Sequence, residues 1–70
     1  MNVRDAVLRV LADSDGPLHW TVIQDRALRD GSIDPFVTND VRAAVLGALR
    51  TLAAEGRIRR TGKGVYTRSG

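Results

Sequence analysis

The chain has 70 residues, of which 43% are hydrophobic and 27% charged, and its formal net charge is +3. This length and composition predict one globular domain with a small core and argue against a disordered chain. The absence of cysteine excludes disulfides and thiolate metal sites and is typical of a cytoplasmic protein. No apolar run reaches membrane-spanning length, and the first residues lack a signal-peptide pattern.

The first predicted helix covers about residues 3–13. Asn2 is a suitable N-cap, and Asp5 follows it at the spacing of a capping box. The turn-forming residues of segment 14–17 end this helix. One face of the helix is apolar at helical spacing and consists of Val3, Ala6, Val7, Val10 and Leu11.

The second predicted helix covers about residues 20–29. Leu18, just before it, is expected to add a short strand beside the C-terminal hairpin. Either His19 or Thr21 can cap the helix, and the pattern does not choose between them. Gly31 suits the left-handed position that ends it. The residues expected to face the core are Val22, Ile23, Ala27 and Leu28.

A loop over residues 31–37 precedes the third predicted helix, which covers about residues 39–55. The loop contains the only phenylalanine, Phe36, which we expect to pin it to the core. Thr38 is expected to be the N-cap of the helix and Gly56 its C-terminal glycine. The inward face contains Val41, Val45, Ala48, Leu49 and Leu52. The outward face contains Arg42, Ala43, Leu46, Gly47, Arg50 and Ala54.

The end of the chain is predicted to form a β-hairpin, with strands over residues 57–61 and 65–67. Gly62 and Gly64 flank the turn and are both expected to adopt positive φ angles. Ile58, together with Val65 or Tyr66, should pack against the helices. Segment 56–68 has no acid and five cations, Arg57, Arg59, Arg60, Lys63 and Arg68.

This charge asymmetry indicates a polyanionic partner, because the preceding segment holds six cations and all eight acids. Protection of a solvated edge strand is the alternative explanation, but it commonly needs only one or two charges. Arginine also suits phosphate, because its guanidinium donates paired hydrogen bonds.

The order of elements predicts a mostly helical α+β fold, a winged helix-turn-helix of three helices followed by a two-stranded wing. The chain from Ala6 to Thr67 also resembles the HARE-type winged helix domains. The resemblance lies in the segment Pro17-Leu18-His19-Trp20, in Thr38 and Leu49 of the third helix, and in the segment Gly64-Val65-Tyr66. It implies a DNA-binding function.

The third helix is then expected to enter the major groove of double-stranded DNA. Asparagine and arginine read adenine and guanine edges there, so Asn39 and Arg42 are candidates for base contact beside Thr38. On the wing, Arg59, Arg60 and Lys63 would hold the backbone or the minor groove. Arg50 and Arg57 would add to the positive field. Trp20 is expected mainly to belong to the core, with contact to the DNA backbone as the alternative.

The protein is thus predicted to be a small DNA-binding transcription regulator, or a phage or mobile-element factor, located at the nucleoid in the cytoplasm. A lone domain of this size has a small interface, so a homodimer or a cooperative array on DNA is expected. One alternative is a protein-interaction module that uses Leu46, Ala43 and Gly47. Another is RNA binding, which the scarcity of free aromatic side chains disfavours.

No catalytic function, cofactor, metal or small-molecule ligand is predicted. No nucleophile lies next to a base in a known pattern, and no helix follows the Gly62-Lys63-Gly64 segment to complete a phosphate-binding loop. His19 is the only histidine, and metal sites need several ligands at compatible spacing. A capping or packing role for His19 is expected instead.

Overall fold

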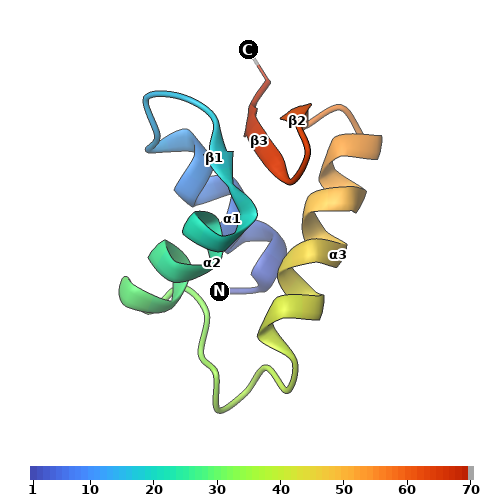
Figure 1. Cartoon of the computed structure of the whole chain (residues 1–70). Helices are drawn as coiled ribbons and strands as arrows, with labels where there is room; N and C mark the ends of the chain where they lie inside the picture. The colour runs from blue at the N-terminus through green and yellow to red at the C-terminus, as the bar shows by residue number, and fades with distance from the viewer. Residues whose placement is uncertain (70) are drawn as a thin grey trace.

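Helices and strands follow one another in the order α1, β1, α2, α3, β2, β3 in the computed structural model, which describes residues 1–69 (Figure 1). Over that range the chain is a small α+β domain with three helices and one three-stranded antiparallel sheet. None of the helices in this part of the chain is long and apolar enough to cross a membrane. The helices are α1 (Val3–Ala12), α2 (Trp20–Arg29) and α3 (Val41–Ala54), and the strands are β1 (Leu18–His19), β2 (Ile58–Gly62) and β3 (Val65–Arg68).

The sheet has the strand order β1-β3-β2, so the last strand of the chain is its centre. The predicted two-stranded hairpin therefore belongs to a three-stranded sheet. The predicted strand at Leu18 is confirmed, because Leu18 is paired with Tyr66 and the next residue of β1 with Val65. A two-stranded hairpin alone is only marginally stable in water, and the added strand ties this one to the start of α2.

Only the second glycine of the hairpin turn has a positive φ angle. Gly64 has φ of 70°, whereas Gly62 lies at the end of β2, opposite Val65, without a positive φ. The expectation for Gly62 was therefore wrong. A two-residue turn over Lys63 and Gly64 can reverse the chain with a positive φ at its second residue alone. The register shifts between Arg60 and Gly62, where β2 has a bulge.

The core lies between the three helices and the inner side of the sheet. The predicted apolar faces of α1 and α3 supply most of it. Val22 was expected to face inward, but it is 38% exposed, because Ile23 and Ala27 already occupy the buried side of α2. The buried apolar residues are Ala6, Val7, Val10, Leu11, Ile23, Ala27, Ile33, Val45, Leu49, Leu52, Ile58 and Tyr66.

The loop between α2 and α3 is pinned to the core by Ile33, not by Phe36. Gly31 turns the chain back with φ of 78°, and the Ile33 N–H then donates to the Ala27 carbonyl at 3.1 Å. As a result Ile33 is 2% exposed. Phe36 is 96% exposed, so the expectation that it anchors the loop was wrong.

Phe36 points outward because a local turn holds it there. The Asp34 carboxylate accepts a hydrogen bond from the Phe36 N–H at 2.9 Å. The Asp34 carbonyl accepts two more, from the N–H groups of Val37 at 3.1 Å and Thr38 at 3.0 Å. These short-range bonds close a turn that leaves Phe36 and Val37 at its surface, with Val37 78% exposed.

The N-cap of α3 is Asp40, not Thr38. The Asp40 carboxylate accepts the Ala43 N–H at 3.0 Å, and the helix begins at Val41 rather than at residue 39. Thr38 belongs to the preceding turn, in which its N–H donates to the Asp34 carbonyl, and α3 begins only at Val41. Asn39 consequently lies before the helix rather than in its first turn. Aspartate at this position also interacts favourably with the helix dipole.

The other predicted caps are confirmed, and α1 and α3 each end one residue before the predicted position, at Ala12 and Ala54. Asn2 caps α1 by accepting the Asp5 N–H at 2.8 Å. His19, one of the two candidates, caps α2, because its Nδ1 accepts the Thr21 N–H at 3.3 Å. Gly56 follows α3 with φ of 77°, and the bonds around it satisfy the last carbonyls of the helix.

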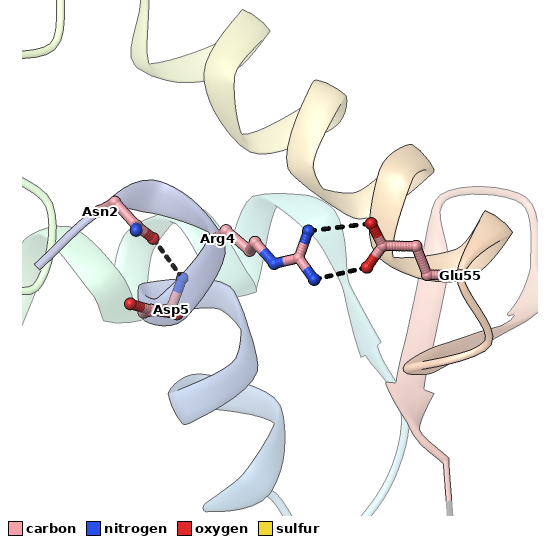
Figure 2. A network of polar contacts seen from close by, with 4 residues as sticks. All are labelled: Asn2, Arg4, Asp5 and Glu55. Carbon is pink, nitrogen blue, oxygen red and sulfur yellow. Dashed lines mark hydrogen bonds and ion pairs between the residues drawn. The ribbon is translucent and has the colours of Figure 1, made fainter.

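A bidentate ion pair joins the start of α1 to the end of α3 (Figure 2). The two terminal nitrogens of Arg4 donate to the two oxygens of Glu55 at 2.9 Å and 2.5 Å. The hydrogen bonds from Arg4 lower the pKa of Glu55, and the partial desolvation of the carboxylate opposes them. Because the two residues are 51 positions apart, the pair constrains the tertiary structure.

Glu55→Gln is expected to lower the free energy of unfolding at pH 7, and the deficit should shrink in acid. Since the pKa of Glu55 is lower in the folded state, the ionised carboxylate stabilises the fold above the unfolded-state pKa of about 4.5. This contribution is lost as the pH falls below that value and through the lower folded-state pKa. Urea unfolding followed by circular dichroism at several pH values measures it.

Asp25→Asn is the matched control. The Asp25 carboxylate pairs with Arg29 within α2 at 3.2 Å, and this pair is more exposed than that of Arg4 and Glu55. The substitution should change stability little at any pH. A Glu55→Gln deficit that stays constant across the acid range would contradict the role given to the ion pair.

Candidate nucleic-acid interface

The outward face of α3 contains a shallow hollow of about 370 Å³. Its apolar part comes from Ala43, which is exposed, and from Leu46, which is half-buried. Exposed cations stand on two sides of it. The residues that line the hollow are Asp40, Arg42, Ala43, Leu46 and Arg50. The structure thus brings the two predicted arginines of α3, Arg42 and Arg50, to one surface.

Arg42 is stacked on the only tryptophan of the chain. The guanidinium carbon of Arg42 lies 5.4 Å from the centroid of the Trp20 ring. Such a contact is worth about 0.5–1 kcal/mol at an exposed site, and it also restricts the conformations of the arginine. Trp20 is half-buried and packs against the core, so it gives Arg42 a fixed support.

The same tryptophan contacts the turn of the hairpin. The backbone N–H of Trp20 donates to the Gly64 carbonyl at 2.8 Å. The approach is so close that a Cβ atom on Gly64 would lie 3.0 Å from Trp20 Cδ1 and 3.1 Å from His19 Nε2. The start of α2 therefore contacts both α3 and the hairpin turn, and Trp20 fixes these two predicted binding elements relative to each other.

The five cations of segment 56–68, the basic hairpin, differ in their contacts. Arg68 donates from Nη1 to the Ala12 carbonyl at 3.0 Å and so caps the end of α1. Arg60 donates from Nε to the Gly62 carbonyl at 3.1 Å across the bulge. The side chains of the other three cations are exposed and make no side-chain hydrogen bond or ion pair with residues 1–69. These are Arg57, whose charge also acts on the Glu55 carboxylate, Arg59 and Lys63. Their charges are open to an external anion.

Thr38 and Asn39 lie differently from the expectation. Both precede α3, and Thr38 is half-buried while Asn39 is exposed. Asp40 lies between them and Arg42, with its carboxylate bound to the first turn of the helix. Asn39 is thus adjacent to the outer face of α3 but is not on it.

Trp20 is the residue whose role was not evident from the sequence. Its contact with Arg42 joins residues 22 positions apart, and no local pattern predicts it. One signal in the sequence could have indicated this role. Trp20 is an aromatic residue in the first turn of the second predicted helix, directly after the short strand that was expected to pair with the hairpin. Trp20 was expected mainly to belong to the core, and its half-buried side chain confirms this expectation in part.

Comparisons of the chain with protein-family models, with curated protein sequences and with solved structures found no significant match. A function must therefore be proposed from the side chains of α3, the start of α2 and the basic hairpin.

Proposed function

We propose that this chain is a winged helix-turn-helix domain that binds double-stranded DNA. In this proposal α3 lies in the major groove and the basic hairpin is the wing, which contacts the adjacent backbone or the minor groove. The observation that carries it is the set of open cations, Arg57, Arg59 and Lys63, on a hairpin whose turn is bound to Trp20. Arginine and lysine side chains without a protein partner are suited to phosphate oxygens.

Arg42 is the best candidate for reading a base. A guanidinium pairs with the O6 and N7 acceptors of guanine in the major groove, and stacking on Trp20 holds that group in place before binding. Ala43 beside it is small enough for a close approach of α3 to the groove. Asn39 and Thr38 would contact a neighbouring base or phosphate from the segment before α3.

The other cations would contact phosphates in such a complex. Arg59, Lys63 and Arg57 would bind phosphates and fix the orientation of the domain, which carries no sequence information by itself. Arg60 would join them by exchanging its bond to Gly62 for a phosphate. Arg50 would add a phosphate contact from the second half of α3.

A role in transcription regulation, or in a phage or mobile element, follows from this proposal for a small DNA-binding chain at the nucleoid. Because one domain offers a small interface, high sequence specificity would require a dimer or a cooperative array on DNA.

Binding to random duplex DNA should weaken steeply with salt. With about four to six phosphates contacted, log K should fall against log salt with a slope of about −4 to −5. Arg59→Ala with Arg60→Ala removes two of these contacts and should make the slope less steep by about 2. Fluorescence anisotropy of labelled duplex at several salt concentrations measures both values.

Arg26→Ala with Arg29→Ala is the matched control, because it removes the same charge from the end of α2. That pair should leave the slope nearly unchanged. A wild-type slope near zero, or equal effects of the two double variants, would contradict the proposal. Competition with duplex RNA and with single strands separates DNA binding from RNA binding.

A further inference from the structure

The turn before α3 presents an apolar knob to solvent. Phe36 and Val37 are 96% and 78% exposed, and the hydrogen bonds to Asp34 hold the backbone under them in one conformation. A fixed turn loses little conformational entropy when its side chains are buried by a partner. Aromatic residues are also enriched in the buried centres of protein interfaces. The knob therefore has the properties of an interface anchor.

The hollow on α3 offers a complementary surface on the same molecule. It has an apolar floor from Ala43 and Leu46, and its volume of about 370 Å³ is within the range of pockets that hold small ligands. The knob cannot fill the hollow of its own chain, because Phe36 is almost fully exposed.

The charges around the knob and the hollow are also complementary. The segment from residue 30 to residue 39, which carries the knob, holds Asp30 and Asp34 and no cation. The hollow is lined by two cations, Arg42 and Arg50, and by one acid, Asp40, whose carboxylate accepts the Ala43 N–H of α3. The acids beside the apolar knob are attracted to a surface on which two arginines outnumber one carboxylate.

We propose that two copies of this chain associate by exchanging these parts, so that the knob of each copy occupies the hollow of the other. The knob and the hollow lie in adjacent segments, residues 36–37 and residues 40–50, so a two-fold axis can satisfy both contacts at once and close the dimer. The contact is small against interfaces that bury about 1,200–2,000 Å² in total, so the dimer is expected to be weak and concentration-dependent.

This association covers the outward face of α3. If that face also binds DNA, which rests on the proposed function, self-association and DNA binding exclude each other. The total protein concentration would then set the fraction of monomer, which is the form that can bind DNA.

Sedimentation velocity of the full chain without DNA tests the association. The wild-type mass should rise with concentration from 7.6 kDa towards twice that value. Phe36→Ser, which removes the knob, and Ala43→Glu, which places a carboxylate in the hollow, should both stay monomeric. Val22→Ser removes another exposed apolar side chain, outside the knob, and should behave as the wild type.

A wild-type chain that stays monomeric up to near-millimolar concentration, or a Phe36→Ser variant that dimerises equally, would overturn the inference. Circular dichroism establishes that each variant is folded.

Duplex DNA should dissociate the dimer, and Phe36→Ser should bind DNA at least as tightly as the wild type. If Phe36→Ser instead weakens DNA binding without a change in mass, the knob contacts DNA and the dimer is wrong. If DNA does not bind at all, the proposed function fails while the mass measurement still decides on the dimer.

Discussion

Ile33→Ala is expected to destabilise the domain by about 2–5 kcal/mol, as is usual when a buried isoleucine is truncated. Ile33 is 2% exposed and is the one core residue supplied by the loop before α3. The core of a chain this short supplies only about 3–5 kcal/mol of stability, so the variant should be largely unfolded at 25 °C. Circular dichroism and urea unfolding measure the loss.

Phe36→Ala is the matched control from the same loop. It removes a larger apolar side chain, but one that is 96% exposed, so stability should change by no more than about 0.5 kcal/mol. Equal losses in the two variants would show that the loop packs differently in solution.

Gly64→Ala is expected to destabilise the hairpin and, through Trp20, to change the position of the Arg42 side chain. An L-residue in the left-handed conformation costs about 1–2 kcal/mol, and Gly64 has φ of 70°. The added Cβ would also lie 3.0 Å from Trp20 Cδ1, so the indole must move. Because Arg42 stacks on that indole, its position would be less well defined.

The consequence for DNA binding can be separated from stability by working at a temperature where the variant is folded. Loss of an exposed cation–π contact of about 0.5–1 kcal/mol corresponds to a weakening of roughly two- to fivefold. Anisotropy at fixed salt measures it. The fluorescence of Trp20, the only tryptophan, reports whether the ring has moved.

Gly62→Ala is the matched control in the same turn, because it causes neither backbone strain nor a close contact with Trp20. Gly62 has no positive φ, and its Cβ would meet only Val65 side-chain atoms at 3.8 and 3.9 Å, which is ordinary contact. Its stability should stay within about 0.5 kcal/mol of the wild type. Equal losses in the two glycine variants would contradict a turn in which Gly64, and not Gly62, has the positive φ angle.

Much of the secondary structure could be predicted because it depends on residues close in sequence. The apolar spacing of α1 and α3, the cap at Asn2 and the glycines after α2 and α3 are all local signals. The choice between Thr38 and Asp40 as the N-cap of α3 could not be made in this way. Both residue types are good N-caps, and only the structure shows that the Asp40 carboxylate accepts the N–H of Ala43 in the first turn.

The candidate site was predictable in its charges but not in its contacts. The excess of cations in the basic hairpin is visible in the sequence, yet only the structure separates Arg68, which caps α1, from Arg59 and Lys63, which have no such bond among residues 1–69. The support of Arg42 by Trp20 depends on how α2 packs against α3, and residue spacing alone does not indicate it.

By itself the sequence determined the helical periodicity, the helix-ending glycines and the basic hairpin, because these depend on side-chain type and short-range geometry. Only the tertiary structure decided that Ile33 is buried and Phe36 exposed, since both are apolar residues of one loop and burial depends on the direction in which Gly31 and Asp34 turn the chain. It also decided that Trp20 joins the hairpin to α3, because that contact requires three elements to be packed at once.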